Sequence, residues 1–177
     1  MNNNMIVLYN TWTGFTQRYA RLIGKELDCP VHALKDAPAD LSQYDAVVFG
    51  SRLHAGTFDG WKKAQKLLAR RGANKLAVFA TGAMPSEAEA QIQKVWDQNL
   101  TPEEQKVIPH FYLQAGLCYE KMGGADRAMI KFAAWAMSRK KSRTAEDEAF
   151  RNAIRQSYDI SDPKYIQPIV TFLKQDN

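Results

Sequence analysis

The stretch MIVLYNTWTGFTQRYARLI, residues 5–23, decides the fold. Its first five residues are apolar throughout, which is typical of a β-strand covered on both faces. From residue 15 onward, apolar residues recur at helical spacing, with polar and basic residues between them. The junction, residues 11–16, therefore places three threonines and a glycine where a buried strand turns into an amphipathic helix.

This junction has two interpretations: an ordinary turn with a helix cap, or an anion site. The N–H groups and the dipole at a helix N-terminus favour an anion. The threonine hydroxyls add donors, and Gly14 lets a ligand come close to the backbone. The pattern G-x-x-x-x-G-K-[ST] of nucleoside-triphosphate sites is absent. Because the junction directly follows a first strand and precedes an amphipathic helix, the sequence favours a phosphate site.

The same alternation of apolar run and helical pattern continues along the chain. Further strands are predicted in the runs at residues 31–34, 46–49, 76–80 and 107–115. The alternation predicts an α/β fold, a three-layer α/β/α sandwich with a five-stranded parallel sheet. We expect one domain over residues 1–177, with an extra helical segment around 116–150.

In sheets of this kind, ligands bind beyond the carboxyl ends of the strands, where the winding direction reverses. The site is therefore predicted in the loops that follow the first, third and fourth strands, residues 10–16, 51–58 and 81–86.

The composition narrows the classes of partner and site. The net charge of +5 favours acidic or phosphate-bearing partners. No recognisable nucleic-acid module accompanies it, so we expect no specific nucleic-acid binding. Cys29 and Cys118 lie far apart, and no histidine or cysteine spacing is typical of a metal site, so none is predicted. No apolar run is long enough to span a membrane, and none at the N-terminus follows a basic segment, so we expect a cytoplasmic location.

Residues 11–16 resemble the phosphate loop [ST]-x-T-G-x-[ST] of the flavodoxin family. Two looser likenesses are VVFGSRLHAG at 47–56 and ADRAMIKFAAWAM at 125–137. They resemble the flavodoxin-domain group that includes the menaquinone-dependent protoporphyrinogen oxidases. The resemblance implies a flavodoxin-like fold and FMN as the cofactor.

The resemblance also implies three sets of cofactor-binding residues. The phosphate would be held by Thr11, Trp12, Thr13, Gly14, Phe15 and Thr16. One side of the isoalloxazine ring would be bordered by Ser51, Arg52, Leu53, His54, Ala55 and Gly56. The other side would be bordered by Thr81, Gly82, Ala83 and Met84.

Arg52 and His54 are in addition candidates for catalysis. Arg52 would bind a substrate carboxylate or steady negative charge on the reduced flavin, and His54 would relay a proton. The alternative interpretation is two polar side chains that face solvent.

Two departures from the flavodoxin pattern bear on function. The segment TGAMPS at 81–86 offers no aromatic ring, and in the second loop only Phe58 does. Flavodoxins that carry electrons are usually acidic, whereas this chain carries +5. We therefore predict an FMN-dependent oxidoreductase, and the resemblance implies that it is similar to protoporphyrinogen oxidase and uses a quinone acceptor. The alternative is an electron-transfer protein without its own substrate. A flavin-free regulatory module is disfavoured, because Asn10 stands where such a module would carry a metal-binding aspartate pair.

Residues 126–143 combine an apolar helical pattern with the basic run SRKKSR at 138–143. One interpretation is peripheral contact with anionic headgroups at the inner face of a membrane, which would bring the flavin near a quinone. If the substrate is a porphyrinogen, its propionates would need cationic neighbours, and Arg52 and the basic run at 139–143 are the candidates. The other interpretation is a core helix, or a helix at a homodimer interface, followed by a solvated charge run.

Overall fold

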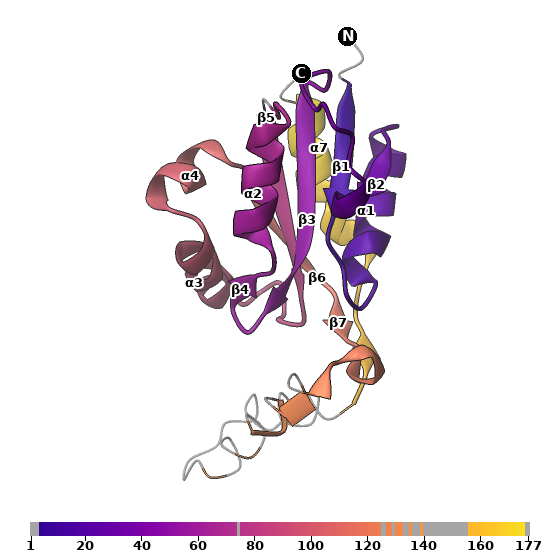
Figure 1. Cartoon of the computed structure of the whole chain (residues 1–177). Helices are drawn as coiled ribbons and strands as arrows, with labels where there is room; N and C mark the ends of the chain where they lie inside the picture. The colour runs from indigo at the N-terminus through magenta and orange to yellow at the C-terminus, as the bar shows by residue number, and fades with distance from the viewer. Residues whose placement is uncertain are drawn as a thin grey trace.

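A computed structural model of the chain describes residues 4–73, 75–124, 127–128, 130–132, 135, 139 and 156–175. Strands and helices alternate along it (Figure 1). The strands are β1 Met5–Tyr9, β2 Val31–Ala33, β3 Ala46–His54, β4 Thr57–Phe58, β5 Lys75–Gly82, β6 His110–Gln114, β7 Gly116–Leu117 and β8 Tyr158–Asp159. The α-helices are α1 Phe15–Glu26, α2 Trp61–Arg70, α3 Glu89–Asn99, α4 Pro102–Val107 and α7 Gln167–Gln175. Short 3-10 helices are η1 Leu34–Asp36, η2 Tyr119–Lys121 and η3 Pro163–Ile166.

Five strands form a parallel sheet in the order β2-β1-β3-β5-β6, and helices cover both of its faces. The predicted three-layer α/β/α sandwich with a five-stranded parallel sheet is therefore confirmed. The short strand β4 is added antiparallel to the end of β3. The winding direction reverses at β1, because β2 lies on one side of it and β3 on the other. The loops after β1 and β3 thus border a crevice at the carboxyl edge.

Alternate residues of each central strand enter two separate cores, as the pleat requires. Val7 and Val48 pack under α1 and α7, whereas Leu8 and Phe49 pack under α2 and α3. Figure 1 shows α2 in front of the sheet and α7 behind it. The core on the α2 side is aromatic, with ring centroids 5.0–6.1 Å apart among Phe49, Phe58, Trp61, Trp96 and His110. Packing on both faces therefore holds in place the strands whose carboxyl ends border the crevice.

The second predicted loop, residues 51–58, is a hairpin in the structure. β3 continues through His54, and the chain turns at Ala55 and Gly56, whose φ angles are +50° and +80°. It returns as β4 with Leu53 opposite Phe58. Two successive positive φ values suit a tight turn between twisted antiparallel strands. The segment was predicted as a loop, whereas all of it except Ala55 and Gly56 belongs to β3 or β4.

The segment after β6 leaves the sandwich. β7 and η2 lie below it in Figure 1, and β7 pairs with β8. Most of residues 125–155 lies outside the described residues, so the extra helical segment around 116–150 stays a prediction. The same holds for most of the basic run at 138–143. Among the described residues, no helix is long and apolar enough to cross a membrane. Nor, in that part of the chain, do three or more potential metal ligands come together.

Candidate functional site

The carboxyl ends of the strands surround a small cavity of about 90 Å³. Its lining residues come from the three predicted loops and from the segment after β6. The lining residues are Thr13, Phe15, Arg52, Leu53, Thr81, Gly82, Ala83, Ala115, Gly116, Leu117, Cys118 and Met122. The structure therefore brings parts of all three predicted sets to one place.

The first loop presents the open N-terminus of α1. Gly14 is the N-cap residue and has the left-handed conformation, with φ +98°. Its N–H donates to Thr11 Oγ1 over 3.1 Å, and no side chain caps the helix. Among the described residues other than its two chain neighbours, a Cβ on Gly14 would meet only Lys121 Nζ, at 4.0 Å. This loop therefore leaves α1's first N–H groups without a side-chain cap, at a backbone that an anion can approach.

Thr16 connects the first loop to the third. Its side chain is buried, and its hydroxyl lies 2.8 Å from the hydroxyl of Thr81, which is also buried. Two buried hydroxyls satisfy one another in this way. The loop after β1 and the end of β5 are thereby held together, and the Thr16 hydroxyl is engaged inside the protein.

Arg52 belongs to the end of β3, and its guanidinium lies beside the first loop. Its Nε donates to Asp59 Oδ2 over 3.0 Å, and its guanidinium lies 5.6 Å from the centroid of the Trp12 ring. Ser51 supports this arrangement, since its buried hydroxyl donates to the carbonyl of Asp59 over 2.8 Å. Trp12 itself is 64% exposed. The site thus presents an exposed aromatic surface backed by a cation.

The β3–β4 turn is directed toward α3. Asn99 donates to the carbonyl of Gly56 over 2.7 Å and accepts the N–H of Phe58 over 2.7 Å. His54 and the turn residues Ala55 and Gly56 are not among the residues that line the small cavity. Phe58, the one aromatic expected in this loop, is 1% exposed and belongs to the core. It is therefore not at the surface where a flavin ring would stack.

The third loop is held by two tyrosines that remain neutral. The Tyr112 hydroxyl donates to the carbonyl of Met84 over 2.9 Å, and the Tyr158 hydroxyl donates to that of Ala83 over 3.4 Å. Burial raises the pKa of both phenols. Because each stays protonated at neutral pH, each remains a donor and adds no negative charge beside the site.

The predicted site omits the segment after β6, although that strand ends at the same edge of the sheet. Gly116, Leu117, Cys118 and Met122 line the cavity from this side. The indole N–H of Trp12 donates to the carbonyl of Lys121 over 3.0 Å. Parallel strands end at a common edge, so the position of the fifth strand alone could have indicated these residues.

The arrangement fits a phosphate better than it encloses a large ring. An open helix N-terminus, a glycine without steric hindrance and a nearby ammonium are suited to an anion. The cavity of about 90 Å³ is small beside the roughly 300–1,000 Å³ usual for cofactor pockets. Much of a flavin ring would therefore lie outside it.

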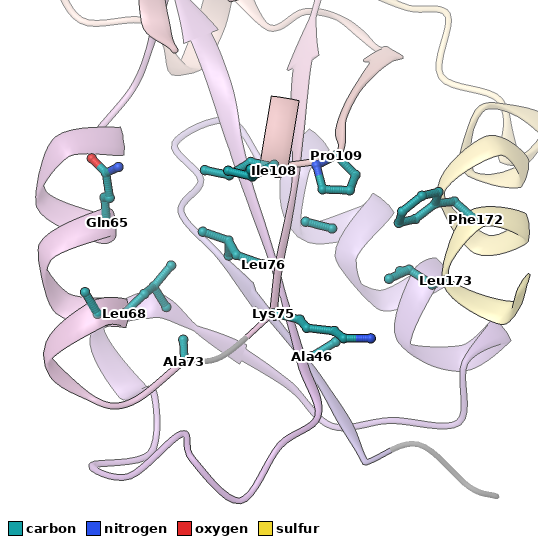
Figure 2. Close-up of a pocket in the computed structure, with 13 residues that line it drawn as sticks. Ala46, Gln65, Leu68, Ala73, Lys75, Leu76, Ile108, Pro109, Phe172 and Leu173 are labelled. Carbon is teal, nitrogen blue, oxygen red and sulfur yellow. The ribbon is translucent and has the colours of Figure 1, made fainter. Parts of the chain in front are cut away.

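Two roomier hollows differ in chemistry. One of about 600 Å³ adjoins the first loop at Thr11 and carries Lys35 and Lys63. The other, of about 560 Å³, lies at the amino-terminal end of β5 (Figure 2). Its lining is mainly apolar, from Leu68 of α2 across Leu76 to Leu173 of α7. The second hollow offers few polar groups that converge on a ligand.

The family described as "Flavodoxin domain" matches residues 6–144. A solved flavodoxin from the Archaea is 18% identical to this chain, with a TM-score of 0.42; the match covers 63% of this chain and 84% of the flavodoxin chain. Oxidised flavodoxin 2 from Bacillus cereus is 18% identical to this chain, with a TM-score of 0.39; the match covers 86% of this chain and 97% of the flavodoxin chain. No curated protein sequence matched.

Proposed function

Because the chain belongs to the flavodoxin domain family, we propose that it is an FMN-binding oxidoreductase. The single observation that carries the proposal is the first loop. There Gly14, at φ +98°, begins α1 without a side-chain cap. This geometry provides the N–H donors and the positive end of a helix dipole to a phosphate. No metal is needed for such a site.

FMN, when bound, supplies the redox chemistry, and the protein supplies position, charge and exclusion of water. Residues 11–16 hold the phosphate, and the ends of β3 and β5 border the ring. Arg52 places a cation beside that region, where it stabilises negative charge on a reduced cofactor or a carboxylate of a substrate. The Asp59 carboxylate fixes the orientation of the guanidinium.

At the finer level we propose a porphyrinogen-like substrate and a quinone acceptor. The support is the likeness of residues 47–56 and 125–137 to the protoporphyrinogen oxidase group, with the net charge of +5. A substrate that carries propionates would be attracted to Arg52 and to a basic surface.

Electron transfer without a substrate is the competing function, and the small cavity favours it. A volume of about 90 Å³ does not enclose both a flavin and a porphyrinogen. On this alternative, the protein only exchanges electrons with a reductase and an acceptor protein.

The first test is the visible spectrum of the purified protein with and without added FMN. Flavin bands, or a shift of the FMN spectrum and quenching of its fluorescence on titration, are expected. A protein that carries no flavin and leaves the FMN spectrum unchanged would contradict the proposal.

The second test separates the two functions in the FMN-loaded protein. Steady oxidation of a porphyrinogen with a soluble quinone is expected of the enzyme, and it should fall in an Arg52→Met variant. A shuttle would be reduced by a flavodoxin reductase and reoxidised by an acceptor, but it would not turn over the porphyrinogen.

We also propose that the region 126–143 contacts an anionic membrane surface on the cytoplasmic side. Phe132 and Trp135 are 65% and 49% exposed, their ring centroids are 5.5 Å apart, and Arg139 lies 4.4 Å from the Trp135 centroid. Exposed aromatics beside a cation are typical of interfacial segments. Sedimentation with anionic vesicles, but not with neutral ones, is expected, and a Phe132→Ser/Trp135→Ser variant should stay in solution. A homodimer through these rings would instead show in the oligomeric state without lipid.

A further inference from the structure

We propose that Lys121 is a direct ligand of the flavin phosphate and makes the site selective for phosphorylated flavin. The inference rests on the proposed FMN site and adds a cation to it. The residue belongs to η2, which follows the fifth strand of the parallel sheet. It lies outside the predicted phosphate loop, residues 11–16.

The ammonium of Lys121 lies over the open side of the first loop. Its Nζ is 3.4 Å from the carbonyl oxygen of Thr13. It is also 4.0 Å from the position that a Cβ on Gly14 would take, and apart from Gly14 and its two chain neighbours no other described residue has an atom within that distance. A positive charge therefore lies at van der Waals distance from the glycine position, next to the N-terminus of α1. The ammonium and the helix N-terminus favour the same kind of ligand, an anion.

The turn that carries Lys121 is held from both sides. On the loop side, the Trp12 indole N–H donates to the Lys121 carbonyl over 3.0 Å. On the other side, Arg127 donates to the carbonyls of Tyr119 and Glu120 over 3.1 and 2.8 Å. The Tyr119 N–H donates to the Ser157 hydroxyl over 2.7 Å. The backbone of Lys121 is thus held beside the loop before a ligand arrives, so only its side chain has to be ordered on binding, which lowers the entropy cost.

The donors of Lys121 are not used up by the protein. Its bond to Thr13 is long and ends on a neutral carbonyl, and the side chain is exposed. Among the residues that the structure describes, no carboxylate pairs with it, since Glu120 accepts from Ser157 and Cys118 instead. An ammonium carries three donors, and a charged oxygen is a stronger acceptor than a carbonyl.

The test compares FMN with riboflavin, which lacks the phosphate, by fluorescence titration. In Lys121→Gln, FMN should bind about 10- to 100-fold more weakly, and riboflavin affinity should not change. Lys106→Gln is the matched control, because it removes the same charge from an exposed position in α4, before β6. It should bind both flavins as the unmodified protein does.

Two further variants sharpen the result. Lys121→Arg should keep most of the FMN affinity, and Lys121→Glu should lose more than the glutamine variant. The affinity of the unmodified protein for FMN should fall as salt rises, with a shallower dependence in Lys121→Gln.

The outcomes separate the inference from the proposed function. If the unmodified protein binds no FMN, the proposed function fails. If it binds FMN and Lys121→Gln binds it equally well, the function stands and the role of Lys121 is overturned. Equal losses for FMN and riboflavin would also overturn it, because they would mean that Lys121 only shapes the loop through Thr13.

Discussion

The two ends of the parallel sheet differ in a way that bears on where function lies. At the carboxyl end, a cavity of about 90 Å³ is bordered by threonine side chains and the cation Arg52, and the open N-terminus of α1 and the ammonium of Lys121 lie beside it. At the amino-terminal end, a hollow of about 560 Å³ is bordered mainly by Leu, Ile, Ala and Phe side chains (Figure 2). The hollow of about 600 Å³ that carries Lys35 and Lys63 also lies at the carboxyl end, so the two ends differ in polar chemistry rather than in size.

The difference follows from how the chain connects. The connections that leave the carboxyl ends of β1, β3 and β5 lead into α1, α2 and α3, and each helix start exposes N–H groups and the positive end of a dipole. At the other end, helices finish and their last side chains pack on one another. Backbone N–H donors therefore gather at the carboxyl end, whereas the amino-terminal hollow is lined mainly by apolar side chains.

The largest expected effect is from Gly14→Asp. A side chain at φ +98° is strained by about 1–3 kcal/mol, and a carboxylate some 4 Å from a phosphate is repelled by roughly 4 kcal/mol at an effective dielectric of 20. FMN affinity should fall by more than about 1,000-fold. Fluorescence titration measures it.

Gly72→Asp is the matched control at the other end. Gly72 has φ +79°, follows α2, and lies near Ser42. The same strain and charge should lower the free energy of unfolding but leave FMN affinity unchanged. If both variants lose FMN equally, the phosphate is not at residues 11–16.

The second effect is from Leu173→Ala at the amino-terminal end. Leu173 is 5% exposed and borders the apolar hollow. Its truncation should lower the free energy of unfolding by about 2–4 kcal/mol in urea denaturation, with no change in FMN affinity. Val107→Ala borders the same hollow but is 75% exposed, so it should change stability by less than about 0.5 kcal/mol. Weaker FMN binding in Leu173→Ala would mean that the ends are coupled.

The third effect is from Thr81→Val. The substitution leaves the buried Thr16 hydroxyl without its partner at 2.8 Å, which should cost about 1–3 kcal/mol of unfolding free energy. The double variant Thr16→Val/Thr81→Val should recover most of it, because both hydroxyls are then replaced by methyl groups of similar shape. Thr57→Val, at an exposed position of β4, is the control. A double variant as unstable as Thr81→Val would argue against the pairing.

The sequence predicts the fold because its signals are local and agree with one another. Apolar runs and helical periods define β1, α1, β3 and β5, and short connections require a parallel sheet. The position of the first loop follows from the same pattern.

The features that the sequence does not predict depend on contacts between residues far apart in the chain. Phe58 was predicted in a site loop, but the aromatic core of α2 and α3 buries it.

Lys121 was missed for a related reason. Its position depends on the bond from Trp12, which is 109 residues away, and on the turn after β6. Neither follows from periodicity, because a single lysine in an irregular segment has no spacing that marks it. Even so, β6 ends at the edge of the sheet where ligands bind, so the residues that follow it could have been searched for a cation such as Lys121.

The smallest expected effect compares two thiols, one at each end of the sheet. Cys118 lines the cavity at the carboxyl end, and Cys29 precedes β2 at the other. Burial, with the nearby Asp28 carboxylate, raises the pKa of Cys29 to about 11. Since the thiolate is the reactive form, Cys29 should react slowly with iodoacetamide at pH 8 and faster as pH rises toward that pKa. FMN should not alter this rate.

FMN should instead slow the alkylation of Cys118 about threefold to tenfold, because the cofactor covers the cavity that the thiol lines. Mass spectrometry of the two cysteine peptides, with FMN or riboflavin at saturating concentration, gives both rates in one sample. Equal protection of both thiols would indicate general stabilisation rather than a bound ring. Protection of neither would place the flavin away from the segment after β6, and the contact between Lys121 and the phosphate would then lose its structural basis.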